Sequence, residues 1–178
     1  MAYGPQDFYS DAHEALTADP GHDGREKVRR RLEKLLANPA FVAEYLANAA
    51  AGKTVLHHDP ETGFYVMAHG TDDYDRVGKP HDHGASWAIY GQATGVTEMT
   101  EWRRLDDGKS EHRAELEVAK KFTLAPGVVA LFDPGTIHST AHPQPARWVR
   151  VTGTDLDHIR RFRYDPDKQT MSAMNAEA

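Results

Sequence analysis

Apolar residues in the first third of the chain recur at helical spacing. From Arg25 onward they return every three or four positions with charged residues between them, which is the pattern of an amphipathic helix. Asn38-Pro39 interrupts this period, because the residue before proline disfavours helical backbone angles. A second stripe follows and ends at Gly52, a residue type common at helix C-termini. We therefore expect N-terminal helices over 25–52, preceded by a loop or extension over 1–24.

After Gly52 the pattern changes to short runs of β-forming residues. The first two runs are joined by DPETG, a strong hairpin signal, and later breaks carry Gly, Pro or Asp. Many short strands at regular spacing indicate a sandwich or barrel. We expect the barrel over 53–164 and a flexible tail over 165–178. The expected strands are 53–58, 64–69, 86–92, 95–103, 114–124, 128–132, 137–142 and 147–152.

Composition narrows the class of protein. The chain has 178 residues, which suits one domain, and it has no cysteine, which excludes disulfides and thiolate ligands. The net charge of -6 argues against nucleic-acid binding. The sequence has no apolar run long enough for a membrane span. Its N-terminus also lacks the basic and apolar stretches of a secretory signal. We expect a cytoplasmic protein that binds neither nucleic acid nor membrane.

Histidine is the unusual residue type, with eleven copies. His81 and His83 are two apart, and on a strand such residues share a face, while Asp82 points away. A lone pair of this kind is weak evidence for a metal site. His138 follows the Pro134-Gly135 turn and can supply a third imidazole, a ligand that suits Zn, Cu, Fe and Ni.

These residues together resemble the two sequence motifs of the cupin superfamily. The first motif corresponds to His81, His83 and Gly95. The second corresponds to Gly127, Pro134, Gly135 and His138, with His142 where asparagine is common. The resemblance implies an all-β double-stranded β-helix, a jelly-roll barrel, that holds one divalent metal.

One departure from the cupin pattern concerns the fourth ligand. Many cupins place a glutamate four to six residues after the second histidine, where this chain has Trp87, Ala88 and Ile89. We therefore expect a three-histidine site. Glu98 lies beyond Gly95, on the next expected strand. It is expected to be an exposed strand residue, and the alternatives are an additional metal ligand or a carboxylate beside the ligands. Three neutral ligands leave the metal its full charge and open positions for substrate and dioxygen.

The segment HDHGASWAIYGQATGVTEMTEW resembles the metal strand of the cysteine dioxygenase family, which implies a mononuclear non-heme Fe(II) dioxygenase. The family's substrate machinery is not matched. Val55 stands near the position of its carboxylate-binding arginine, and Ala88 replaces the crosslinking cysteine. The positions that correspond to the family's Ser–His–Tyr relay hold Trp148, Arg150 and Thr152, and none of them matches. A substrate other than free cysteine is therefore expected, a small thiol or carboxylate.

Several other residues are candidates for roles around the metal. Arg150 can anchor a carboxylate, with a surface ion pair as the alternative. His142 can act in acid–base catalysis or lie at the rim. Trp87 and Tyr90 are expected in the core or the cavity wall, with a substrate contact as the alternative. The hairpin histidines, listed by position, are expected at the surface or in the core: His57, His58 and His69.

Three functions remain open from the sequence. The first is an Fe(II) dioxygenase that uses dioxygen and a small-molecule substrate. The second is a Zn-, Mn- or Ni-dependent isomerase, lyase or hydrolase, and the third is a binding module without turnover. A homodimer is compatible with each of them.

Overall fold

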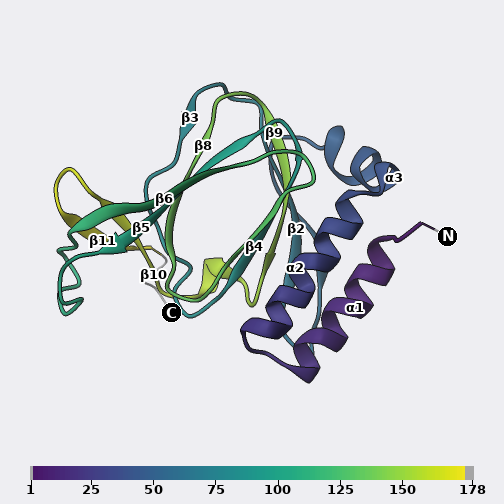
Figure 1. The fold of residues 1–178 in the computed structure, drawn as a ribbon, viewed down its shortest axis with the longest axis horizontal. Coiled ribbons are helices and arrows are strands. Elements are labelled where there is room, and N and C mark those ends of the chain that lie inside the picture. Colours follow the sequence, from purple (N-terminus) through teal and green to yellow (C-terminus); the bar gives the residue numbers. More distant parts are fainter. Residues whose placement is uncertain (1, 175–178) are drawn as a thin grey trace.

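Two antiparallel sheets pack face to face in the computed structural model, which describes residues 2–174 (Figure 1). The five-stranded sheet has the order β1-β2-β9-β4-β7, and the four-stranded sheet has the order β3-β8-β5-β6. Their bounds are β1 Gly52–His58, β2 Tyr65–Thr71, β3 Arg76–Val77, β4 Ala88–Thr94, β5 Thr97–Arg104, β6 Leu116–Leu124, β7 Val129–Phe132, β8 Ile137–His142 and β9 Ala146–Thr152. Two antiparallel sheets in this arrangement form a jelly-roll barrel, the double-stranded β-helix architecture that was predicted.

The strand predictions are confirmed to within about two residues, with the short β3 as the one barrel strand not expected. Strand alternation explains the layering around β4. Ile89 packs with the helices on the outer face, whereas Ala88 and Tyr90 face the interior with Met99 and Phe132. Both faces of β4 are therefore buried.

The helices cover the outer face of the five-stranded sheet (Figure 1). They are α1 Pro5–Ala18, α2 His22–Leu36, α3 Pro39–Val42 and the π-helical turn η1 Ala43–Ala47. The predicted interruption at Asn38-Pro39 is confirmed: α2 ends at Leu36, and the Asn38 side chain caps α3 by accepting from the amide of Ala40 at 3.0 Å. Leu32 and Leu36 lie against β4 at Gly91, where a Cβ atom would come within 3 Å of both side chains.

Two predictions about this region are wrong. The segment 1–24 is not a loop, because α1 occupies most of it and buries Phe8 completely. Gly52 does not end a helix: the helical region stops at Ala47, and Gly52 begins β1 with a φ of 116°. This backbone conformation is one that glycine adopts without strain.

The predicted flexible tail over 165–178 is wrong for the part that the structure describes. Strands β10 (Arg161–Asp165) and β11 (Thr170–Met174) form an antiparallel hairpin beside the four-stranded sheet (Figure 1). Tyr164 and Met171 are buried there with Ile137 and Ala114. A short 3-10 turn, η2 (Leu156–His158), leads into it. Positions 175–178 of the prediction lie outside the described residues.

Among the residues that the structure describes, none of the helices is both long and apolar enough to cross a membrane.

Candidate metal centre

Three histidines converge in the interior of the barrel. One side-chain nitrogen from each of His81, His83 and His138 lies within 4.8 Å of the other two. No carboxylate joins this group among residues 2–174, in agreement with the expected three-histidine set. His83 and His138 are almost completely buried, at 1% and 0% exposed.

Backbone pairing fixes the distance between the two sequence motifs. The amide of His81 donates to the carbonyl of His138, and the amide of His138 donates to the carbonyl of His81, each at 2.9 Å. The amide of Gly135, in the turn before β8, donates to the carbonyl of Gly84 at 3.1 Å. Backbone hydrogen bonds therefore join the loop after β3 to β8 at His81 and to the turn before β8 at Gly84.

The His81–His83 segment is an anchored loop rather than a regular strand, since only His81 makes an isolated β-bridge. The two imidazoles still share a side because Asp82 is held on the other. Its carboxylate accepts from the amides of Gly84 (2.9 Å) and Phe162 (3.0 Å) and from the Tyr164 hydroxyl (2.6 Å). The C-terminal hairpin therefore positions the metal-binding loop.

Gly84 is required by this loop geometry. It has a φ of 58°, and an added Cβ would lie 2.2 Å from the carbonyl oxygen of Arg160. A larger residue would push the loop away from the hairpin.

The environment keeps the three imidazoles neutral. Burial lowers the pKa of His83 and of His138 well below the ordinary value, and the proximity of His81 and of Arg150 lowers both further. Burial also lowers the pKa of His81. Neutral imidazole is the form that binds a metal ion.

The donor set fits a divalent transition metal. Both ring nitrogens of His138 are buried, and neither has a hydrogen-bond partner among the described residues. An unpaired buried polar side chain is costly, and a bound cation removes that cost. His81 Nδ1 lies 3.1 Å from the carbonyl oxygen of Lys79, which can only accept, so Nδ1 carries the proton and Nε2 keeps its lone pair for a metal.

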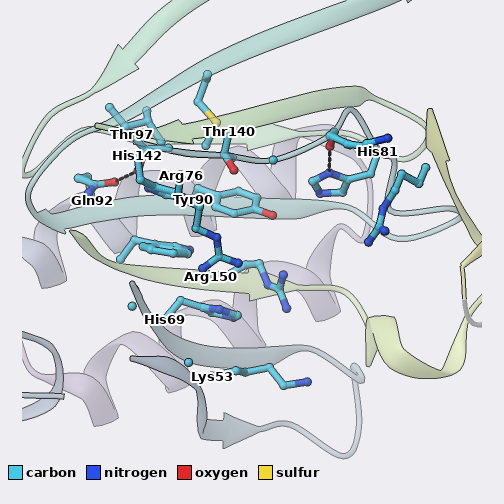
Figure 2. A pocket seen from close by; sticks show the side chains of 18 of the residues that line it. Lys53, His69, Arg76, His81, Tyr90, Gln92, Thr97, Thr140, His142 and Arg150 are labelled. Carbon is cyan, nitrogen blue, oxygen red and sulfur yellow. Dashed lines mark hydrogen bonds between the residues drawn. The ribbon is translucent and has the colours of Figure 1, made fainter. Parts of the chain in front are cut away.

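A cavity of about 560 Å³ opens beside the histidines, between the two sheets (Figure 2). His81 is the member of the group that lines it. Tyr90 and Arg150 are paired across β4 and β9, and both line this cavity. The Tyr90 hydroxyl lies 3.2 Å from His83 Nε2, which places a phenol directly beside the metal ligands.

The other end of the cavity is aromatic and polar. His142 is buried, its Nδ1 lies 3.2 Å from the Thr97 hydroxyl, and its ring stacks on Trp148 at 4.7 Å. Thr97 in turn donates to the Gln92 side chain at 2.8 Å (Figure 2). Burial and the charge of Arg76 lower the pKa of His142 to about 4. His142 is therefore in the cavity wall but away from the metal ligands.

His69 is the hairpin histidine that sequence reasoning did not place in the cavity. It lies on β2, lines the cavity and also stacks with Trp148, at a ring-centroid distance of 5.5 Å. Burial and then the charges of Arg150 and Lys53 lower its pKa to about 2. No local sequence signal identifies it, because its place in the wall depends on the pairing of His69 with Trp148 across β2 and β9. His57 and His58 instead stack on Tyr9 and Tyr65.

The remaining candidates lie away from the cavity. Trp87 packs in the helix-facing core against Gly153, so its position does not support a substrate contact. Glu98 is exposed on β5 and is not among the converging side chains. Val55 is 52% exposed on β1, while Lys53, two residues earlier, lines the cavity.

The positions expected to correspond to the relay lie on β9. Trp148 and Arg150 line the cavity, whereas Thr152 is buried and donates to the carbonyl of Thr154 at 2.8 Å. A phenol reaches the metal ligands from β4 instead, through Tyr90.

The sequence matches no protein-family model and no curated protein. Similar solved structures include an uncharacterised protein with a double-stranded β-helix domain from Klebsiella pneumoniae (17% identity, 62% of this chain and 80% of that chain, TM-score 0.43). KdgF from Halomonas sp. is 17% identical, over 62% of this chain and 87% of that chain, with a TM-score of 0.43. The DMSP lyase DddQ from Ruegeria pomeroyi is 14% identical, over 67% of this chain and 51% of that chain, with a TM-score of 0.43. Similarity at this level says nothing about substrate or metal.

Proposed function

We propose that this protein is a mononuclear non-heme Fe(II) dioxygenase, with His81, His83 and His138 as the metal ligands and a small carboxylate-bearing molecule as its substrate. The observation that carries the proposal is the convergence of three neutral imidazoles, without a carboxylate, at the wall of a cavity. Three protein ligands are enough to hold a catalytic metal and leave positions open for other molecules.

The charge of the ligand set supports oxygen chemistry. Because all three ligands are neutral, the metal keeps its full positive charge and can hold an anionic substrate group. When bound, Fe(II) supplies the redox chemistry that lets dioxygen react with an organic molecule. A dioxygenase places both oxygen atoms in the substrate, so no external reductant is consumed.

The chain's own residues can orient the substrate and position a proton. Arg150 lines the cavity beside Tyr90 and presents a guanidinium that can bind a carboxylate through two parallel hydrogen bonds. The Tyr90 hydroxyl, at hydrogen-bond distance from His83, can hold or donate a proton at the reacting end of the cavity. Tyr90 and Arg150 together take the place of the relay that Trp148 and Thr152 cannot form.

Metal analysis and oxygen consumption test the proposal. Protein purified without added metal should contain iron, and iron-loaded protein should consume dioxygen with some members of a panel of small thiols and carboxylates. Zinc-loaded protein and the variant His138→Ala serve as controls, and neither should consume oxygen. One dioxygen per substrate without added reductant would identify the reaction class.

The outcome that would contradict the proposal is equally specific. Zinc, manganese or nickel in the purified protein, together with no oxygen uptake after iron loading, would favour a metal-dependent isomerase, lyase or hydrolase on the same three histidines. Absence of any bound metal would favour neither enzyme and would overturn the assignment of the site.

A further inference from the structure

The cavity beside the histidines is strongly cationic. Among residues 2–174, its lining contains no Asp or Glu, although the chain as a whole carries a net charge of -6. Six of the lining residues are Lys or Arg: Lys53, Arg76, Lys79, Arg150, Arg161 and Arg163. A concave, low-dielectric surface with one sign of charge attracts ligands of the opposite sign.

Only part of this charge is neutralised within the protein. Lys53 and Arg161 share one carboxylate, Asp157, and Lys79 pairs with Asp165 at 3.1 Å. Within residues 2–174, no ion pair forms at the other three cations: Arg76, Arg150 and Arg163. The cavity therefore keeps an excess of positive charge that a ligand can satisfy.

Arg150 and Arg161 lie beside the metal ligands and close to each other. Both line the cavity that His81 lines. Arg150 is paired across the strands with Tyr90, whose hydroxyl lies 3.2 Å from His83 Nε2. Arg161 lies on β10 two residues before Arg163, which forms a β-bridge with His81, and burial and the charge of Arg150 lower the pKa of Arg161. The Nε of Arg150 and that of Arg161 are both buried without a hydrogen-bond partner among the described residues. Within residues 2–174, the one hydrogen bond of the Arg150 side chain is a weak contact from Nη2 to the sulfur of Met67 at 3.8 Å. Two neighbouring guanidinium groups with unused donors form a binding position for a carboxylate.

A second cationic position is separated from the first along the barrel. Arg76 is paired across β3 and β8 with His142, which lies four residues along β8 from the metal ligand His138. Four residues of strand span about 13 Å. Two separated cationic positions match two separate negative charges better than one doubly charged group.

We infer that the substrate of this cavity is a small dicarboxylate, with one carboxylate held by Arg150 and Arg161 beside the metal and the other held toward Arg76. This inference deepens the proposed function, because it assigns the substrate class of the same cavity. It also separates the protein from an enzyme that takes a zwitterionic amino acid, whose ammonium group would meet repulsion from the lining.

Binding of charge-matched ligands tests the inference without any turnover. Isothermal titration calorimetry on zinc-loaded and on metal-free protein would compare linear dicarboxylates of about three to six carbons with their monoamides, which keep size and shape but lose one charge. At least one dicarboxylate should bind at least about tenfold more tightly than its monoamide, because hydrogen bonds to charged groups are the strong ones. Inorganic phosphate is the probe for a single doubly charged group.

Variants locate the two ends of the ligand. Arg150→Gln and Arg76→Gln should each weaken binding of the preferred dicarboxylate by about tenfold or more, while Arg76→Gln leaves its monoamide little changed. Arg76 is exposed on a two-residue strand, so its variant should fold normally. The matched control is Arg30→Gln on α2, whose side chain is 71% exposed, and it should bind like the unmodified protein.

The inference is overturned if no dicarboxylate binds, if each binds no better than its monoamide, or if phosphate binds as tightly as the preferred dicarboxylate. It is also overturned if Arg150→Gln and Arg30→Gln behave alike. Because these measurements need neither iron nor oxygen, dicarboxylate binding without oxygen uptake would disprove the dioxygenase and leave the ligand class standing. Oxygen uptake with a substrate that carries one negative charge, and with no dicarboxylate, would support the dioxygenase and disprove the dicarboxylate inference.

Discussion

Tyr90 illustrates how one side chain can matter to chemistry without holding the metal. Its hydroxyl lies 3.2 Å from His83 Nε2, and its ring forms part of the cavity wall. Replacing Tyr90 with Phe keeps the ring and removes only the proton-bearing group. We expect metal content to stay unchanged and kcat/KM to fall by about 10²-fold, which is typical of losing a general acid or base.

Steady-state oxygen consumption and metal analysis on the same Tyr90→Phe preparation would check this. The matched control is Tyr74→Phe, since Tyr74 is 72% exposed and lies outside the cavity. Unchanged turnover in Tyr90→Phe would show that the phenol is only part of the wall.

At the scale of elements, the C-terminal hairpin is predicted to support the metal site. The Tyr164 hydroxyl donates to Asp82, between the two histidines of the first motif, at 2.6 Å. Burial and this carboxylate raise the pKa of Tyr164 above its usual value, so the phenol remains a donor. Tyr164→Phe should lower the free energy of unfolding by about 1–2 kcal/mol and weaken metal binding by about 10- to 100-fold.

Urea unfolding and competition with a chelator measure these two effects. A drop in stability with unchanged metal affinity would mean that the hairpin stabilises the barrel without positioning the histidine loop.

The helical layer makes a separate prediction about stability. Leu32 is completely buried between α2 and β4, where Gly91 allows close approach. Leu32→Ala should cost about 2–5 kcal/mol in the free energy of unfolding, as is usual for truncation in a packed core. The metal content of the folded fraction should not change, because α2 packs on the outer face of the sheet. A cost below about 1 kcal/mol would contradict this packing.

Local patterns predicted the barrel strands because each is a short run of β-forming residues with Gly, Pro or Asp in the turn that follows it. They missed α1, although Phe8, Tyr9, Ala12, Ala15 and Leu16 have helical spacing and the Asp7 carboxylate accepts from the Gly4 amide at 2.8 Å. The acidic and proline-rich flanks of α1 obscured that period. The hairpin β10–β11 was missed because its burial depends on contacts such as Tyr164 with Asp82, 82 positions apart.

The metal ligands could be identified from spacing because the motifs carry them in fixed local positions. The cavity could not, because its wall is assembled across strand registers that no local pattern gives. His69 faces Trp148 across β2 and β9, and Arg161 lines the cavity from a hairpin whose second strand lies in the expected tail. Arg150 was a candidate, yet nothing in the sequence pattern indicated that a second arginine lies beside it.

For the whole molecule, buried neutral histidines predict acid sensitivity. The pKa of His142 is about 4 and that of His69 about 2 in the folded protein, both below the unfolded value of about 6.5. At pH values between the folded-state pKa of each histidine and about 6.5, the unfolded chain binds more protons than the folded protein. The free energy of unfolding therefore falls as the pH falls below about 6.5. Each histidine contributes at most about 1.4 kcal/mol per pH unit to the slope of the free energy of unfolding against pH.

Urea unfolding of metal-free protein at several pH values between about 7 and 4.5 measures the slope. His142→Gln should flatten it, whereas His158→Gln should not, because the His158 side chain is 82% exposed. Equal slopes for these two variants would show that His142 does not contribute.

The central claim is that His81, His83 and His138 hold one metal ion, and anaerobic Fe(II) titration of metal-free protein tests it most directly. The unmodified chain should bind about one ion, as should His142→Gln, whose histidine lies in the same cavity but contacts Thr97. His138→Ala should lose that ion while keeping its folded circular dichroism spectrum. Retention of about one tightly bound ion by folded His138→Ala would contradict the account.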